Sequence, residues 1–182
     1  MRIIAGTHRG TRLKEPAQIT RPTSDRVREA IFNVLFHVVP EAKVLDLFAG
    51  TGALGLEALS RGASHCRFIE SDSQALRCLR ENLAHTKFTN GKIIEGDAIR
   101  FLKSNQSQLT FDLIFADPPY FRNGAPDMAG QLLEIGLPLA PDGILVLEVE
   151  SERETPKSPR GLTLIKRKDY GKTSILYFEK TS

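Results

Sequence analysis

The sequence lacks the features that mark several large classes of protein. It contains only two cysteines in 182 residues, Cys66 and Cys78, and they form neither a CxxC pair nor a disulfide framework. The four histidines share no metal-ligand spacing with one another or with the cysteines. No apolar run approaches the ~18 residues of a membrane span, and the first residues lack the apolar core of a signal peptide. We therefore expect a cytoplasmic protein with no metal site and no membrane contact.

Glycine and proline, with 14 and 10 residues, are too scarce for a collagen-like or low-complexity chain. A hydrophobic fraction of 41% is in turn too high for wholesale disorder. The length suits one globular domain of roughly 100–200 residues. We predict a single domain over residues 23–182, preceded by a short basic extension over residues 1–22, and we expect the chain to be a monomer.

Basic residues are concentrated at the two ends of the chain. Residues 1–28 hold seven Lys and Arg residues against two acidic ones, and residues 151–182 hold eight against four, whereas residues 29–150 hold ten against sixteen. This pattern favours a polyanion bound at the ends, although basic ends that only keep a protein in solution would look the same. The N-terminal candidates for phosphate contacts are Arg2, Arg9, Arg12, Lys14, Arg21, Arg26 and Arg28.

Apolar runs of strand length alternate with segments of helical periodicity through most of the chain. Strands are predicted over residues 44–48, 67–70, 92–95, 111–116 and 144–149, and helices over residues 24–36, 54–59, 73–86, 98–102 and around 128–135. Such alternation implies right-handed crossovers and a parallel sheet with helices on both faces. Two more strands, over residues 162–166 and 174–178, have no helix between them. The predicted fold class is α/β: a doubly wound, mostly parallel seven-stranded sheet with an antiparallel C-terminal hairpin and a small N-terminal basic hairpin.

In such a fold the chemistry is expected at the carboxyl ends of the parallel strands. The first predicted strand leads into Gly50, Gly52 and Gly55, which match the pattern GxGxxG between a strand and a helix. Taken alone, this pattern says only that the backbone turns tightly and that a ligand can approach it. Asp46 adds to the signal, because a carboxylate in an otherwise apolar strand requires a partner, such as the ammonium group of a ligand.

Two further acids follow the next two strands. Glu70 ends the second strand, where a carboxylate can accept hydrogen bonds from both hydroxyls of a ribose. Asp97 and Ala98 follow the third strand, and Asp97 suits either the cap of the next helix or a hydrogen bond from an adenine amino group. Together with the glycine turn, these residues predict a pocket for an adenosine that carries a cationic group.

The fourth strand ends in Asp117, Pro118, Pro119 and Tyr120. The two prolines restrict two φ angles and remove two N–H donors, which leaves carbonyl acceptors on a stiff loop. Asp117 adds carboxylate acceptors, and Tyr120 adds a flat aromatic face. Acceptors beside a stacking face suit a planar group that bears an NH₂, such as the exocyclic amine of a nucleobase.

These segments, in this order and spacing, resemble the class I S-adenosylmethionine-dependent methyltransferases that act on amino groups. The segments are DLFAGTG at residues 46–52, Glu70, GDA at residues 96–98 and DPPY at residues 117–120. The ends of the chain contain five further segments: RIIAG at residues 2–6, RG at 9–10, RPT at 21–23, RVREAIFN at 26–33 and YGKT at 170–173. These segments resemble the RsmD family, bacterial enzymes that methylate a guanine N2 in small-subunit ribosomal RNA.

The resemblance implies a Rossmann-like class I methyltransferase with S-adenosylmethionine as its cofactor. The implied cofactor-binding residues are Asp46, Phe48, Gly50, Gly52, Glu70, Asp97 and Ala98, and the implied catalytic residues are Asp117, Pro118 and Tyr120. The implied activity is methyl transfer to the exocyclic N2 amine of a guanine in 16S ribosomal RNA, either free or in the assembling small subunit. The seven N-terminal basic residues would contact RNA phosphates.

Other functions stay open at this point. An adenine-N6 methyltransferase also uses DPPY, but it usually needs a separate target-recognition domain, for which 182 residues leave no room. A nicotinamide-dependent oxidoreductase fits GxGxxG and Glu70 but gives DPPY no role. A non-catalytic RNA-binding module would not need the intact motifs. A protein-glutamine methyltransferase typically has Asn at the position of Asp117.

Overall fold

The computed structural model describes residues 1–16, 24–105, 109–119, 127–152, 154 and 161–181. Its strands are β1 (Lys43–Leu47), β2 (His65–Glu70), β3 (Gly91–Glu95), β4 (Phe111–Ala116), β5 (Leu139–Glu150), β6 (Leu162–Tyr170) and β7 (Thr173–Lys180). Its helices are α1 (Asp25–Val34), α2 (Ala53–Ser60), α3 (Ser73–Thr86), α4 (Ala98–Asn105) and α5 (Met128–Ile135). Strands and helices therefore alternate from β1 to β5, as the sequence predicts.

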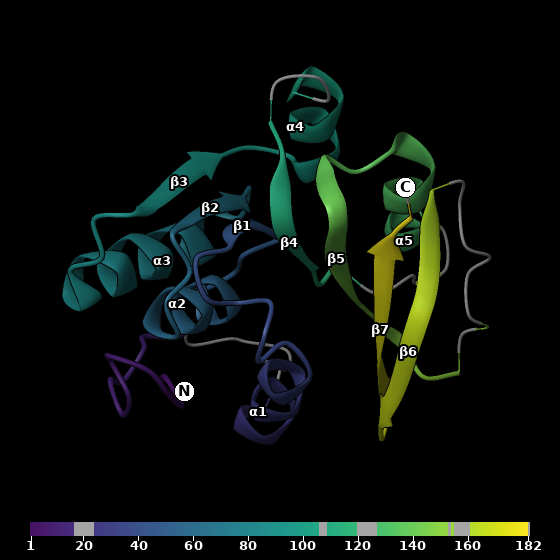
Figure 1. Ribbon diagram of the computed structural model, residues 1–182. Helices are drawn as coiled ribbons and strands as arrows, with labels where there is room; N and C mark the ends of the chain where they lie inside the picture. Colours follow the sequence, from purple (N-terminus) through teal and green to yellow (C-terminus); the bar gives the residue numbers. More distant parts are fainter. Residues whose placement is uncertain (17–23, 106–108, 120–126, 153, 155–160, 182) are drawn as a thin grey trace.

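All seven strands form one sheet in the order β3-β2-β1-β4-β5-β7-β6 (Figure 1). The strands β1 to β5 pair in parallel, whereas β7 is antiparallel to both β5 and β6. The predicted seven-stranded, doubly wound α/β fold with an antiparallel C-terminal hairpin is confirmed. The strand order reverses between β1 and β4, so their carboxyl ends flank the point where an open α/β sheet binds its ligand.

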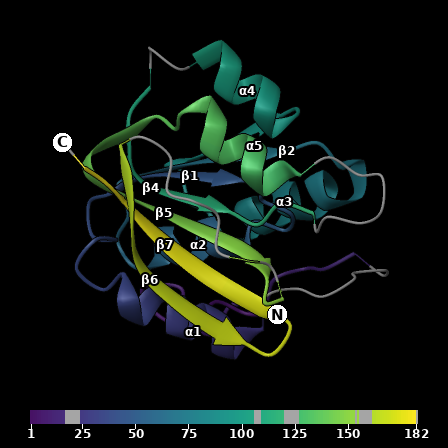
Figure 2. The same cartoon turned by 90° about the vertical axis from the view of Figure 1, so that its right-hand side faces the viewer.

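Different helices cover the two faces of the sheet (Figures 1 and 2). On one face, α1, α2 and α3 pack on the sheet through a core that includes Phe32, Leu56 and Phe68. On the other face, α4 and α5 pack around side chains such as Leu45 and Ile114. Because both faces are covered, the central strands β1 and β4 are buried along almost their whole length.

The N-terminal residues pack against α2. Residues 1–16 fold back on themselves, with one antiparallel bridge between Arg2 and Arg12. The N–H groups of Ile4 and Ala5 donate hydrogen bonds of 2.7 and 3.0 Å to the carboxylate of Glu57, a fully buried residue of α2. The predicted N-terminal hairpin is thus present in short form, and this N-terminal loop, residues 1–16, is tied to the sheet through α2.

Some element ends differ from the prediction, and strand pairing explains most of the differences. The strand β5 begins at Leu139 rather than at residue 144, because Leu139 already pairs with Phe111 of β4. Pro141, Asp142 and Gly143, residue types that favour turns, lie within this strand next to a register shift. Similarly, β6 continues through its basic residues to Tyr170 because β7 pairs with it over that length.

Candidate active site

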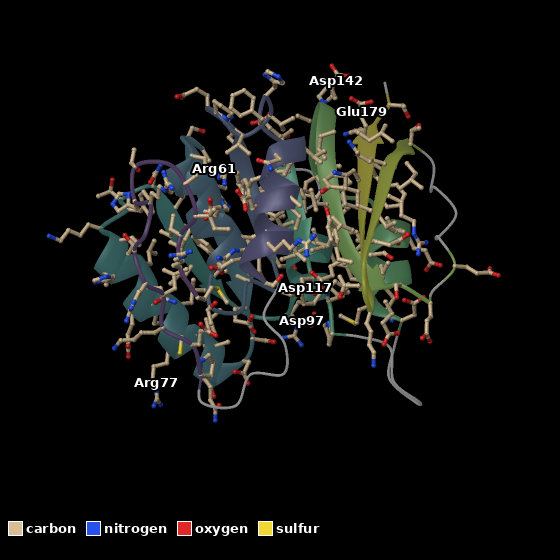
Figure 3. The ribbon with its side chains drawn as sticks, turned by 90° about the horizontal axis from the view of Figure 1, so that it is seen from below. Arg61, Arg77, Asp97, Asp117, Asp142 and Glu179 are labelled. Atoms are coloured by element: carbon tan, nitrogen blue, oxygen red, sulfur yellow. The ribbon has the colours of Figure 1, made fainter. Side chains whose placement is uncertain are left out.

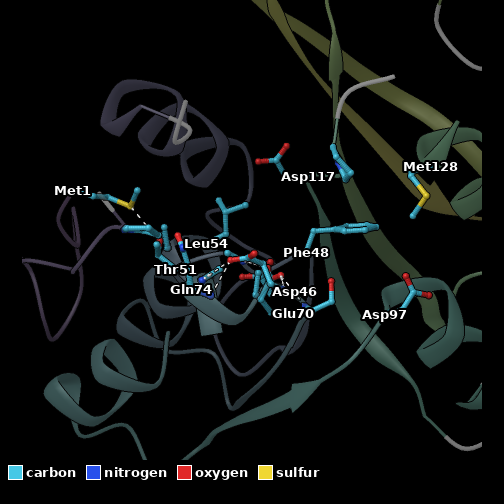
Figure 4. A pocket seen from close by; sticks show the side chains of 18 of the residues that line it. Met1, Asp46, Phe48, Thr51, Leu54, Glu70, Gln74, Asp97, Asp117 and Met128 are labelled. Carbon is cyan, nitrogen blue, oxygen red and sulfur yellow. Dashed lines mark hydrogen bonds between the residues drawn. The ribbon is translucent and has the colours of Figure 1, made fainter. Parts of the chain in front are cut away.

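The carboxyl ends of β1, β2, β3 and β4 meet around one cavity of about 640 Å³ (Figure 4). Five acidic side chains contribute to its wall: Asp46, Glu70, Asp72, Asp97 and Asp117. Phe48, Ala49 and Gly50 from the glycine turn line it as well. Of the predicted cofactor-binding residues, the structure brings all except Gly52 and Ala98 to this wall. Those two lie at the first turns of α2 and α4, beside residues that do line it.

The turn between β1 and α2 depends on left-handed backbone conformations. Phe48, Gly50 and Gly52 have φ angles of +63°, +56° and +83°. A side chain on Gly52 would also collide with Leu79, and one on Gly55 would press into the ring of Phe68. Glycine is therefore required both for the turn and for the close approach of α2 to β2, and this approach points the helix N-terminus toward the cavity.

Asp46 lies deep at the base of the cavity, with only 2% of its surface exposed. The Gly55 N–H donates a 2.9 Å hydrogen bond to its Oδ2 atom. Burial raises the pKa of Asp46 to about 7; the Gly55 hydrogen bond opposes the rise and the charge of Glu70 adds to it. Among the described residues, no ion-pair partner for Asp46 is found, so a cationic ligand group would relieve the cost of burying this carboxylate.

Glu70 is held at the mouth of the cavity by backbone donors. Its Oε2 atom accepts a 2.7 Å hydrogen bond from the Gly50 N–H, and its Oε1 atom accepts from the N–H groups of Ser71 and Asp72, both at 2.7 Å. These bonds connect the glycine turn to the end of β2. Each carboxylate oxygen has two lone pairs, so Oε1 is saturated by its two donors, whereas Oε2 keeps one lone pair that can face a ligand.

Asp97 fills the first of the two roles that the sequence allows, the cap of the next helix. Its Oδ1 atom accepts a 2.8 Å hydrogen bond from the Arg100 N–H and so caps α4, while the residue is exposed at the cavity wall. Figure 4 shows Asp97 on the side of the cavity near Met128, apart from Asp46 and Glu70. The cap fixes the position of Asp97, and its remaining acceptor atoms can serve a ligand.

Asp117 follows β4 and lines the cavity near α1 (Figures 3 and 4). Burial raises the pKa of Asp117 well above its usual value, and the nearby charges of Glu148 and Asp46 raise it further. Pro118 is buried, whereas Pro119, which the prediction of the site omitted, lines the cavity. Tyr120 lies outside the described residues.

Known proteins match this chain along almost its whole length. The family model described as "Conserved hypothetical protein 95" matches residues 1–179. Ribosomal RNA small subunit methyltransferase D of Escherichia coli K12 is 39% identical over 99% of this chain and 90% of its own length. The protein of the same name from Haemophilus influenzae is 36% identical over 98% and 93%. This chain belongs to the RsmD family.

The three-dimensional fold agrees with this family membership. The solved structure of yhhF from Escherichia coli superposes with a TM-score of 0.86 at 38% sequence identity, covering 100% of this chain and 98% of that one. A match of this kind spans the sheet, the helices and the N-terminal residues together. The described N-terminal segments that resemble the RsmD family, at residues 2–6, 9–10 and 26–33, are thus part of the shared fold.

The basic residues that the RsmD resemblance assigns to RNA do not all lie at the surface. Arg2, Arg9, Arg12, Lys14 and Arg26 are exposed, and Arg21 lies outside the described residues. Two of the exposed residues form ion pairs: Arg2 with Asp25 at 3.5 Å, and Lys14 with Glu81 at 2.5 Å. Both pairs are at the surface, where exchange of a carboxylate for another anion costs little.

The structure contradicts the sequence prediction for Arg28. The structure places this residue in the interior, with 0% of its surface exposed, so its assignment to RNA phosphates is wrong. It lines the same cavity as the acids, together with Met1 and Pro16 of the N-terminal loop. The charge pattern of the sequence could not separate Arg28 from its exposed neighbour Arg26, because burial depends on how α1 packs.

Glu148 is a second residue that the sequence reasoning missed. It lies on β5, one position beyond Leu147, which pairs with Ala116 at the end of β4. This register brings it to the level of Asp117, whose pKa it raises. The sequence did contain a signal for Glu148, because it is an acidic residue near the end of an apolar strand. The same pattern identified Asp46.

The described residues contain no group of three or more His, Cys, Asp or Glu side chains that could hold a metal ion. Within the same residues, no helix has the length and apolar character needed to cross a lipid bilayer.

Proposed function

We propose that this chain transfers a methyl group from S-adenosylmethionine to the exocyclic N2 amine of a guanine in small-subunit ribosomal RNA. The observation that carries the proposal is the convergence of Asp46, Glu70, Asp97 and Asp117 on one cavity beside the glycine turn. Relatives along the full chain are named for methylation of small-subunit ribosomal RNA. Because that RNA is cytoplasmic in bacteria, we place the protein in the cytoplasm.

The cavity wall suits the proposed cofactor, which supplies an electrophilic methyl group on a positively charged sulfur. Asp46, buried without a cationic partner among the described residues, is suited to the ammonium of its amino-acid end. Glu70 is suited to the ribose hydroxyls, and Asp97 with the backbone of Ala98 to the adenine. Phe48, Gly50 and Gly52 form the turn that approaches the amino-acid end. A wall with five carboxylates complements a ligand that carries two positive charges.

Asp117, the Pro118 carbonyl and Tyr120 act on the target base in this proposal. An aromatic amine is a poor nucleophile because its lone pair is delocalised into the ring. Hydrogen bonds from its two protons to Asp117 and to the Pro118 carbonyl favour a pyramidal nitrogen whose lone pair is available. Asp117 then accepts the proton that the nitrogen loses; a strong base is not required, because methylation makes that nitrogen acidic. Tyr120 stacks on the base and sets its angle.

The target guanine must leave its stack before it can enter the cavity, at a cost of a few kcal/mol that is smaller in a loop than in a helix. Exposed basic residues of the N-terminal loop would hold the surrounding RNA backbone. Such contacts supply affinity and register, whereas the choice of base depends on the cavity itself.

Labelling of ribosomal RNA tests the proposal. Purified protein and methyl-labelled S-adenosylmethionine are incubated with small-subunit RNA, free or in particles, from cells that lack this protein. We expect label in N2-methylguanine, little labelling of RNA from cells that contain the protein, and none with Asp117→Ala. Label in N6-methyladenine or in protein glutamine would overturn the proposed substrate. A protein that binds RNA but transfers no label, or that binds a nicotinamide cofactor instead, would overturn the proposed activity.

A further inference from the structure

Arg28 is a fully buried cation whose hydrogen-bonding capacity is only partly used. It lies on α1, and its Nη2 atom donates to the backbone carbonyl of Arg2 and, at 2.8 Å, to Oδ1 of Asp25. Among the residues that the structure describes, its Nε and Nη1 atoms have no hydrogen-bond partner. Leaving buried donors of a charged group unpaired is costly, so a fold that retains them points to an acceptor that is supplied from outside the chain.

The position of Arg28 shows where such an acceptor would lie. The residue lines the cavity that also contains Asp46 and Asp117, and it carries the only Lys, Arg or His side chain among the described lining residues. The α-amino group of Met1, also at this wall, is already paired with Glu15. Arg28 is ion-paired with Asp25 through Nη2 alone, so an anionic group that enters this otherwise acidic cavity is expected on the side of Arg28, toward its remaining donors.

The chemistry of the proposed cofactor matches this distribution of charge. Its amino-acid end carries an ammonium and a carboxylate on one carbon atom, beside the positive sulfur. The acids of the wall can satisfy the positive groups, but they repel the carboxylate. We infer that Arg28 binds this carboxylate through its unpaired guanidinium donors while Asp46 binds the ammonium, so that the two residues together recognise an amino-acid zwitterion. This inference rests on the proposed function, because it concerns the same cavity.

The guanidinium group is suited to this task. Its planar fork of N–H donors matches the two oxygens of a carboxylate, and charge-assisted hydrogen bonds of this kind are among the stronger ones in proteins. The Nη2 contacts to Arg2 and Asp25 fix the orientation of the group in the ligand-free protein, which lowers the entropic cost of a further contact. Arg28 also connects the N-terminal loop to α1, and the experiment must separate that structural role from ligand binding.

A thermodynamic cycle with two ligands and two proteins distinguishes ligand binding by Arg28 from its structural role. S-adenosylhomocysteine and its decarboxylated analogue, 3-(5′-adenosylthio)propylamine, differ in the carboxylate alone. Their dissociation constants are measured by titration calorimetry for the wild-type chain and for Arg28→Met, which retains an unbranched side chain without donors. We expect removal of the carboxylate to weaken binding to the wild-type chain on the order of ten- to a hundredfold, and to have almost no effect on Arg28→Met.

Arg77→Met serves as the matched control. Arg77 is exposed on α3, does not line the cavity, and points outward from the molecule, away from Asp117 (Figure 3). Its variant should distinguish the two ligands as strongly as the wild-type chain does. Arg28→Lys, which keeps the charge but loses the fork, should retain only part of the distinction.

The outcomes separate the inference from the function on which it rests. If the wild-type chain fails to bind S-adenosylhomocysteine, the proposed function fails. If it binds both ligands and Arg28→Met weakens the two equally, Arg28 has only a structural role and the inference is overturned. If Arg28→Met does not fold, the inference can be tested on the wild-type chain alone. The measurement is then the Nε–H resonance of Arg28 in NMR spectra. It should shift with S-adenosylhomocysteine and stay in place with the decarboxylated analogue; the same shift with both would overturn the inference.

Discussion

Asp46 illustrates how the environment of a single carboxylate links stability to ligand binding. Its pKa is raised to about 7 by burial, whereas an aspartate in an unfolded chain titrates near pH ~3.9. Between these two pH values the folded state holds a proton that the unfolded state has lost. The stability of the ligand-free protein should therefore fall as the pH rises from about 4 to about 7 and be insensitive to this group at higher pH.

Replacement of Asp46 by Asn should remove this contribution. We expect ligand-free Asp46→Asn to be more stable than the wild-type chain at pH 8, by up to about 4 kcal/mol, with a smaller difference at pH 5. Urea unfolding at the two pH values measures the difference. Asp142→Asn, at an exposed position, controls for the loss of one negative charge. Equal stability differences at the two pH values would show that Asp46 does not titrate in this range.

Asp117 should matter for the reaction more than for binding of the cofactor. In Asp117→Asn the side chain keeps its size but can no longer take a proton, so we expect kcat to fall by about 10²- to 10⁴-fold. The affinity for S-adenosylhomocysteine should stay within about threefold of the wild-type value, because Asp117 is assigned to the base rather than to the cofactor. Single-turnover kinetics and calorimetry measure the two quantities. An equal loss in both would reject the assigned role.

The attachment of the N-terminal loop to α2 depends on one buried side chain. Glu57 accepts hydrogen bonds from the N–H groups of Ile4 and Ala5, and its Oε1 atom forms a 2.7 Å ion pair with Nε of Arg61. Removing the carboxylate leaves these donors without their acceptor in a region from which water is largely excluded. The same loop contributes Met1 and Pro16 to the cavity wall, so the element that carries basic residues also shapes the site.

We expect Glu57→Ala to lower the free energy of unfolding by about 3 kcal/mol, because it breaks a buried ion pair and two backbone hydrogen bonds together. Urea denaturation of the ligand-free protein measures the change. Glu81→Ala is the matched control, since Glu81 pairs with Lys14 at the surface and its removal should have little effect. A similar, small change in both variants would show that Glu57 does not hold the loop in place.

Element boundaries were predictable where the periodicity was strong and the ends were marked. The limits of α3 and β4 agree with the predicted ranges, and the Ser24 side chain caps α1 by accepting from the Val27 N–H. The start of β5 was not predictable, because a proline and a glycine within four residues favour a turn in any local reading. Pairing with β4 overrides that preference, and pairing is a property of the assembled sheet.

At the scale of the whole molecule, the basic ends of the chain contrast with an acidic cavity. Reversal of two exposed residues, Arg9→Glu with Arg12→Glu, should weaken RNA binding and flatten its dependence on salt. If each residue contacts one phosphate, the slope of log K against log salt should decrease in magnitude by about 1.5. Filter binding at several salt concentrations measures both effects.

The matched control makes the same change of charge on the opposite face of the sheet, with Arg100→Glu and Lys103→Glu on α4. This variant should bind RNA with nearly the wild-type salt slope. Equal effects of the two double variants would indicate that RNA responds to net charge alone and is not held by the N-terminal loop.

The sequence alone determined the parts of this protein that depend on local order: the alternation of strands and helices, the glycine turn, and the acids that end the strands. Parallel strands place their carboxyl ends at one edge of the sheet. The alternation of strands and helices therefore already implied that Asp46, Glu70, Asp97 and Asp117 lie close together, as they do around the cavity. Only the tertiary structure decided which basic residues face solvent and which one faces the cavity. Arg26 and Arg28 are neighbours on one helix, and their difference arises from packing of α1 against the N-terminal loop and the sheet, contacts between segments distant in sequence.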